Sequence, residues 1–436
     1  LMRPELLARR PAWGGGRRNH VSLALEPLDE GSIRQLVEGL LEEPAPALVP
    51  LVVSRSEGNP FFAGEIVRSL LERGVDLRDS TALADAAERL PDTVQATVLA
   101  RLDSLDPVPR RLLQLGSVFG RSFSAEGVRA IEASSADLAD AVEQLIEREL
   151  LRPTGRGELT YRHIIIRDVA YGTLTRSDRA ALHAAAGRWL ERRAIDREDE
   201  LAELVAFHYR EAAVLASSYD GVDPGLRSSA VHWLRRAAEV AAGARGMVEA
   251  AGHLRAAIDL ALPAEQPPIH QRLGEVLASG DASVEAYARA WQLGRDRGLP
   301  PDFLLENLSR HLMVLCRWFA SVGQQAGEEE IARLIAVGES WLPEAGPRAR
   351  ATFLIALSFK PFWLRQSSVR PVTEADVEEA RAHVREGLAL AEEIDDPQLI
   401  SAALDAEVGT YQSADWRLAV KLSRRRMQLG DRLPLE

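Results

Sequence analysis

Two short segments carry side chains whose types and spacing suit ligand binding. The first is the run Ser56-Glu57-Gly58-Asn59-Pro60, in which glycine and asparagine tolerate positive φ and proline cannot continue a preceding helix. It predicts a turn, in which glycine leaves the backbone accessible and proline offers an apolar ring face. The second segment is Tyr161-Arg162-His163. Its imidazole can donate to an anion, and its charge changes near neutral pH.

Known catalytic motifs are missing around these segments. A phosphate loop of the Gly-x-x-x-x-Gly-Lys-Ser/Thr type is absent, because neither Lys360 nor Lys421 follows a glycine-rich turn. No His-Glu-x-x-His or Gly-x-Ser-x-Gly motif occurs. The stretch 23–30 imitates a magnesium-binding strand that ends in two acids, but Pro27 breaks the strand and Asp29 is better placed to cap a helix. We therefore expect no catalytic residue and no metal ligand.

The composition is that of an ordinary globular protein, with 46% hydrophobic and 27% charged residues among 436. A net charge of −12 argues against nonspecific nucleic-acid binding, which needs a basic surface. The single cysteine, Cys316, cannot form an internal disulfide, and the N-terminal residues do not resemble a signal peptide. We expect a cytoplasmic protein with no membrane span, because every apolar run is shorter than the roughly 18 residues that a span needs.

Helical spacing of apolar residues predicts the elements that must position the two segments. Three helices are expected before residue 80, and shorter ones are expected after Pro91. A longer helix then leads into two extended runs around the turn 154–157, which read as a β-hairpin. Asp29, Asp92 and Ser124 are each expected to cap the start of a helix. Another helix is expected to begin at Phe61, and two more are expected at Leu48 to Ser54 and Asp137 to Leu150.

Several helices closed by one hairpin have the order of a winged helix. The helix before the hairpin, which would be the recognition helix, carries four acidic residues that would repel phosphate. We therefore do not expect DNA binding through this domain. These residues are Asp137, Asp140, Glu143 and Glu147.

After Tyr171 the pattern stays helical to residue 436, with breaks about every 35 residues, a period typical of helical-hairpin arrays. Two units can be superposed, each with small residues twelve apart. They are Ala238 and Ala250 in one unit, and Gly274 and Ala286 in the next. Small residues at this spacing are expected where two helices of a hairpin approach closely. We expect Trp189, Trp233, Trp291 and Trp416 to lie in the core on apolar helix faces.

Four blocks of sequence resemble bacterial STAND proteins, the signal-transduction ATPases with numerous domains, which are often fused to class III adenylate or guanylate cyclases. The blocks occur in the order expected of that family. They are Arg3 to Asn19, Ser56 to Phe62, Leu90 to Asp103, and Tyr161 to Tyr171. The helical repeats that follow resemble the family only in a general way.

The resemblance implies roles for five residues in binding ATP or ADP, with Mg²⁺ in the intact protein. The turn Gly58, Asn59 and Pro60 would lie against the adenine. His163 would contact the β-phosphate of ADP and hold the closed state, and Arg3 would be a sensor arginine near the γ-phosphate. The family's methionine-histidine-aspartate motif reads Arg162-His163-Ile164 here, so two of its residues differ. Without a ligand, Pro60 would simply begin a helix and His163 would be a structural residue.

The fold class expected is mainly α: the C-terminal part of an AAA-type ATPase module, a winged helix with a β-hairpin, and an α-solenoid of helical hairpins. The corresponding ranges are 1–80, 90–172, 173–220 (a helical linker) and 225–436. Because the phosphate loop is absent, we expect this chain to be a fragment whose nucleotide core lies upstream.

Two hypotheses for function follow. In the first, the chain is the regulatory part of a STAND switch. Nucleotide closes the lid, a protein or small-molecule inducer binds the repeats, and a fused effector, preferably a cyclase, is released. In the second, the chain is a scaffold that binds other proteins through its repeats, or part of a helix-turn-helix regulator. A phosphate loop encoded upstream of Leu1 would favour the switch.

Overall fold

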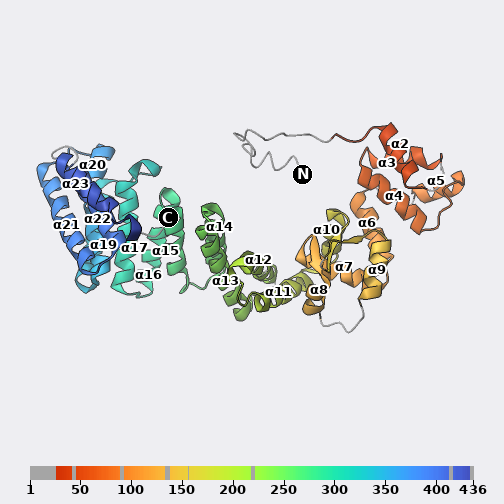
Figure 1. Ribbon diagram of the computed structural model, residues 1–436, viewed down its shortest axis with the longest axis horizontal. Coiled ribbons are helices and arrows are strands. Elements are labelled where there is room, and N and C mark those ends of the chain that lie inside the picture. The colour runs from red at the N-terminus through yellow and green to blue at the C-terminus, as the bar shows by residue number, and fades with distance from the viewer. Residues whose placement is uncertain are drawn as a thin grey trace. The chain divides into compact units, whose positions relative to one another are not determined.

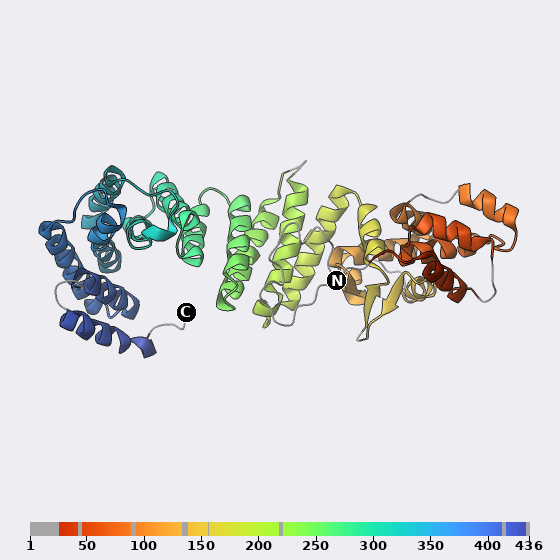
Figure 2. The same cartoon turned by 90° about the horizontal axis from the view of Figure 1, so that it is seen from above.

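The computed structural model describes residues 26–41, 46–88, 93–132, 138–155, 157–217, 221–411 and 416–432, which are mainly helical (Figures 1 and 2). The chain divides into two compact units. The first unit comprises Leu1–Val128 and Ser134–Leu174, and the second comprises Arg129–Ala133 and Thr175–Glu436. No helix in the described ranges is long and apolar enough to span a membrane. Arg3 lies outside the described residues.

The first unit opens with helices that share one apolar core. Their buried faces include Ile33, Val52, Ile66 and Leu70. Asp29 accepts a hydrogen bond from the Ser32 amide (2.7 Å), which confirms the expected helix cap. These helices are α2 (Glu30–Gly39), α3 (Leu48–Ser56), α4 (Pro60–Glu72) and α5 (Ser80–Glu88).

The rest of the first unit combines short helices with an antiparallel sheet of strand order β1-β3-β2. Strands β2 and β3 pair as Leu151 with Tyr161 and Pro153 with Leu159, so the predicted hairpin is confirmed. The elements are α6 (Val94–Asp103), α7 (Pro107–Phe119), β1 (Ser122–Ser124), α8 (Ala125–Ile131), α9 (Ala139–Glu147), β2 (Leu151–Pro153), β3 (Glu158–Tyr161) and α10 (Ile164–Gly172). Thr93 caps α6 by accepting from the Ala96 amide, and Asp92, the expected cap, lies outside the described residues.

One buried tyrosine holds the sheet against α7, and one arginine joins α10 to α7. The Tyr161 hydroxyl donates to the Leu113 carbonyl of α7, and the Tyr161 ring lies 5.5 Å from that of Phe123. From α10, Arg167 Nε donates to the Ser117 carbonyl at 2.8 Å. Strand β1, which no sequence pattern predicted, is fixed by its antiparallel pairing with β3 and by the buried Phe123 ring.

A buried ion-pair network joins α4 to α6 and to the end of α9. The Arg101 side chain is 3% exposed and donates to Glu65, which is 1% exposed, at 2.6 Å. Arg101 also donates to both oxygens of Glu72 (3.1 and 2.8 Å) and to the Arg148 carbonyl (2.7 Å). The planar fork of arginine can satisfy all these acceptors together.

The second unit is an array of helices in which each packs on a neighbour along the chain. Short connections between packed neighbours make them antiparallel, as expected of helical hairpins. The helices are α11 (Arg176–Arg193), α12 (Glu198–Ala216), α13 (Pro224–Gly243), α14 (Met247–Leu260), α15 (Gln266–Leu277), α16 (Asp281–Asp296), α17 (Pro301–Arg317), η1 (Phe319–Ser321), α18 (Glu328–Trp341), η2 (Leu342–Glu344), α19 (Pro347–Leu357), α20 (Lys360–Ser367), α21 (Glu374–Glu393), α22 (Pro397–Tyr411), α23 (Trp416–Met427) and η3 (Gly430–Arg432).

Small residues lie where these helices approach one another. A Cβ on Gly274 of α15 would lie 2.8 Å from the Tyr287 ring of α16, and a Cβ on Gly187 of α11 would lie 2.9 Å from the Tyr209 ring of α12. The close approach expected at Gly274 is therefore confirmed. Beyond α17 the regular succession changes, because α17 packs more on α19 than on α18, and α19 packs on α21 rather than on α20.

The expectation that the four tryptophans lie in the core is right for Trp233 and Trp291 (4% and 5% exposed) and wrong for Trp416, which is 68% exposed. Trp189 is partly buried. Trp416 and Leu422, the buried residue of α23, lie about 120° apart around a helix, so they cannot share one buried face.

Replacing Arg101 tests the ion-pair network. We expect Arg101→Met to lower the free energy of unfolding by about 3–5 kcal/mol, because Glu65 would be left in a buried site without its main partner. Urea denaturation measures this change. Arg110→Met is the matched control, because the Arg110–Asp103 pair is exposed and such pairs contribute about 1 kcal/mol or less. Equal effects from the two variants would contradict the buried role of Arg101.

The second unit should lose stability as the pH falls below 6.5. Burial lowers the pKa of His311 from 6.5 to about 4, and it does the same for His208. The unfolded chain therefore binds protons that the folded chain does not bind. Stability is fully present above pH 6.5, and each histidine removes about 1.4 kcal/mol per pH unit as the pH falls toward 4.

His311→Gln isolates one histidine of this pH effect. The amide oxygen can still accept from the Trp291 Nε1–H, which lies 3.3 Å from His311 Nδ1, but the side chain no longer titrates. We expect the slope of unfolding free energy against pH between 6.5 and 4 to fall by about 1.4 kcal/mol per unit. An unchanged slope in His311→Gln would refute the assignment.

Candidate functional site

The turn at Gly58 has a backbone that only glycine fits. Gly58 has φ of +75°, and a Cβ there would lie 2.6 Å from the Leu28 carbonyl oxygen and 2.7 Å from the Pro27 Cβ. The Leu28 amide donates to the Gly58 carbonyl at 2.8 Å, so the turn is held against the start of α2. Glycine is required here by close packing of protein on protein.

Asn59 and Pro60 form the N-terminus of α4. Asn59 Oδ1 accepts from the amides of Phe61 (3.0 Å) and Phe62 (3.2 Å), and Pro60 occupies the first helical turn, where its missing N–H is not needed. Both side chains are exposed. Pro60 thus begins a helix, and its ring face is also open to a ligand.

His163 occupies the corresponding position at the start of α10. Its Nδ1 accepts from the Ile165 amide at 3.4 Å, so the neutral imidazole carries its proton on Nε2 and can donate outward. Burial lowers the pKa of His163 from 6.5, and the charge of Arg121 lowers it further, while Glu65 and Asp168 oppose the shift. The neutral, donating ring is therefore favoured at neutral pH.

The structure brings the two segments together through Phe61. The Phe61 and His163 rings stack with centroids 4.0 Å apart and an interplanar angle of 17°. Phe61 directly follows Pro60, so the Gly58–Pro60 turn and His163 meet although they are far apart in sequence. Phe61 was predicted only as a helix start. The sequence signal for its role in the site was its position directly after the turn, within the block 56–62.

The chemistry of this cluster suits a ligand with a planar apolar part and an anionic part. Pro60 offers an exposed apolar ring, His163 offers an Nε2–H donor, and Arg121 places a positive charge close enough to influence His163. Among the described residues, no group of three or more His, Cys, Asp or Glu side chains could hold a metal ion.

Comparisons with known proteins find only similarities of low sequence identity. No family model matches the chain. An uncharacterised protein of Rhizobium meliloti (strain 1021) is 26% identical over 299 residues, covering 64% of this chain, and the match spans only 28% of that protein.

Two solved structures show a weaker likeness. One is a STAND protein with a tetratricopeptide repeat sensor from Pyrococcus horikoshii (TM-score 0.30, 11% identity, 95% of this chain and 74% of that one). The other is yeast Tom70 (TM-score 0.23, 15% identity, 92% of this chain and 82% of that one). TM-scores this low carry no argument about fold or function.

Replacing Phe61 tests the ring stack. Burial is the main cause of the lowered pKa of His163, and Phe61 covers one face of its ring. We expect Phe61→Ala to raise the pKa of His163 toward 6.5, measured by NMR titration of the imidazole. Phe362→Ala in the second unit is the control and should leave the pKa of His163 unchanged. An unshifted pKa in Phe61→Ala would contradict the stack.

Proposed function

We propose that this chain is the regulatory part of an ATP-dependent signalling switch of the STAND type. Nucleotide held beside Gly58, Pro60 and His163 keeps the molecule closed, and an inducer that binds the helical repeats favours the open state. Opening then releases an effector domain, for which an adenylate or guanylate cyclase is our first choice. A ligand can drive this change only through different affinities for the two states.

The observation that carries the proposal is the stack of Phe61 on His163. The motif resemblance implies that a nucleotide binds between the turn and the histidine. Phe61 belongs to the first motif and His163 to the second, and their ring centroids lie 4.0 Å apart. This convergence of the two motifs supports a shared role in one site.

The arrangement of α7 to α10 supports a winged helix that acts as a lid. Its three-stranded antiparallel sheet and hairpin agree with that architecture. On α9 the acidic side chains of Asp140, Glu143 and Glu147 are exposed, which argues against a DNA-reading role because they would repel phosphates. We therefore assign this domain to nucleotide binding.

Arg101 gives the lid a defined closed position. It ties α4, which begins at Pro60, to α6 and to Arg148 after α9. Because breaking a buried ion pair is costly, the closed arrangement is a discrete state rather than one of many. Glu65 takes part in the network and also influences the pKa of His163, so the ion pair and the proposed nucleotide site share a residue.

The alternative is a scaffold that only binds other proteins through its helical hairpins. Arrays of this kind commonly present extended binding surfaces. A scaffold would need neither a neutral His163 nor an open Pro60. Nucleotide binding therefore separates the two functions.

Binding of a fluorescent ADP analogue to the purified chain provides the test. We expect saturable binding that His163→Ala weakens about tenfold or more, because a hydrogen bond to a charged group contributes about 1.5–3 kcal/mol. The same replacement at the exposed His232 should change nothing. Absence of binding, or equal binding to the His163→Ala variant, would favour the scaffold.

ATP turnover by the same protein gives a second readout. Because no phosphate loop is present, we expect no magnesium-dependent hydrolysis by the pure chain. Measurable turnover would contradict the assignment to the regulatory part. Sequencing the gene upstream of Leu1 for a phosphate loop and an acidic strand is the complementary observation.

A further inference from the structure

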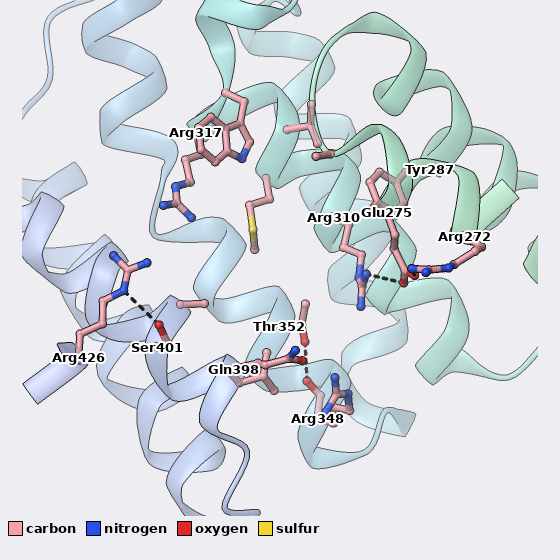
Figure 3. A pocket seen from close by; sticks show the side chains of 16 residues that line it. Arg272, Glu275, Tyr287, Arg310, Arg317, Arg348, Thr352, Gln398, Ser401 and Arg426 are labelled. Carbon is pink, nitrogen blue, oxygen red and sulfur yellow. Dashed lines mark hydrogen bonds and ion pairs between the residues drawn. The ribbon is translucent and has the colours of Figure 1, made fainter. Parts of the chain in front are cut away.

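A large cavity lies within the second unit, between helices α15 to α17, α19, α22 and α23. Its volume is about 660 Å³, within the range of about 300–1,000 Å³ typical of small-molecule sites. Figure 3 shows Arg310 and Glu275 on one side of this cavity and Arg426 with Ser401 on the opposite side. The site proposed for nucleotide is in the other unit and does not use any of these residues.

Arginine is the dominant polar residue of the cavity wall. Five of the described lining residues are arginines and one, Glu275, is acidic. Carboxylates balance three of the arginines. Glu275 pairs with Arg272 and Arg310, Glu239 also pairs with Arg272, and Glu306 and Asp396 pair with Arg348. The lining arginines are Arg272, Arg310, Arg317, Arg348 and Arg426.

Arg317 and Arg426 form the part of the wall with excess positive charge. Within the described ranges, both guanidinium groups pair with a single carboxylate, Asp405. Arg426 Nε also donates to the Ser401 hydroxyl at 3.1 Å, which adds no charge. Two cations sharing one anion leave a local net charge of +1 in this cluster, together with N–H groups that can donate to a second anion.

The Arg317 guanidinium is held in place by aromatic rings. It lies 4.9 Å from the centroid of the Trp318 ring and 5.2 Å from that of Phe359. Stacking and the Asp405 pair fix its orientation, so little side-chain entropy is lost when an anion binds. Arg317 is 25% exposed at its side chain and therefore remains accessible from the cavity.

An apolar surface adjoins this positive region. Met313, Val314 and Leu399 line the main cavity, and Trp318, which is 46% exposed, lines both it and a second cavity of about 270 Å³. Phe362 lines the second cavity and is 39% exposed. Large aromatic side chains left open beside a cation suit a ligand with both an apolar and an anionic part.

We propose that these adjoining cavities bind a small organic anion. Its carboxylate or phosphate is held by Arg317 and Arg426, and its apolar portion packs against Trp318. This inference deepens the proposed function, on which it rests for its biological meaning, because it states the chemistry of the inducer that the repeats recognise. The binding site itself requires no nucleotide.

The test uses four probes with the intact chain: phenyl phosphate, benzoate, benzyl alcohol and inorganic phosphate. Isothermal titration calorimetry measures their affinities. We expect phenyl phosphate or benzoate to bind more tightly than both the uncharged ring and the ringless anion. The tighter of the two identifies phosphate or carboxylate as the preferred group. If neither binds more tightly than benzyl alcohol, the proposal is overturned.

Variants of the wall locate the binding. Arg317→Gln should weaken binding of the preferred probe about tenfold, as expected for loss of a charge-assisted hydrogen bond. Arg295→Gln is the matched control, because Arg295 also stacks on a tryptophan, 5.6 Å from the Trp291 centroid, and pairs with an acid outside the cavity. Equal losses in both variants would exclude the assigned site. Circular dichroism confirms folding, and Arg426→Gln provides a second variant of the same anion site.

Trp318→Ala tests the apolar contact. It should weaken phenyl phosphate binding and leave inorganic phosphate unaffected, and an unchanged affinity for phenyl phosphate would contradict packing on Trp318. His163→Ala should retain anion binding, and Arg317→Gln should retain ADP binding. In the intact chain, absence of anion binding while ADP still binds defeats this inference, whereas absence of ADP binding while the anion still binds defeats the nucleotide switch.

Discussion

The buried pairing of Arg101 with Glu65 is the interaction on which the first unit depends. Helix α4 carries Glu65 one turn after Phe61, so fixing Glu65 against α6 also fixes the start of the helix. Phe61 then lies on His163 at the start of α10. The candidate nucleotide site is therefore a consequence of where a buried guanidinium finds its acceptors, since an unpaired charge in that interior would be very unfavourable.

The second unit relies on a different constraint, the close approach of helices over small residues. Aromatic rings of one helix cover glycines of the preceding one, as Tyr287 covers Gly274. Such contacts allow neighbouring helices to pack closely, and helices α15 to α17, α19, α22 and α23 line the arginine-rich cavity. Packing thus decides which side chains face the cavity, and Arg310 and Arg426 come to share it from distant helices.

Arginine serves both units because one guanidinium can satisfy several acceptors. Arg101 bridges three elements with one side chain, whereas Asp405 receives two guanidinium groups. Groups of the protein itself satisfy the Arg101 guanidinium, and the result is a rigid contact between these elements. Around Asp405, donor capacity is left over, and the result is a surface suited to an anion. The same residue type is structural or ligand-binding according to the number of acids around it.

Interactions between residues close in sequence explain which structural features the sequence alone determined. The Asp29 cap, the Gly58–Pro60 turn, the start of α4 and the β-hairpin depend on residues within a few positions of each other, and so they could be predicted. Strand β1, the stack of Phe61 on His163, the pairing of Arg101 and the sharing of Asp405 join residues that are distant in the chain. The exposure of Trp416 was mispredicted for a related reason, because burial depends on which helix face finds a neighbour. Only tertiary packing decides these, since the free energy of a contact depends on burial and charge that the chain acquires when it folds.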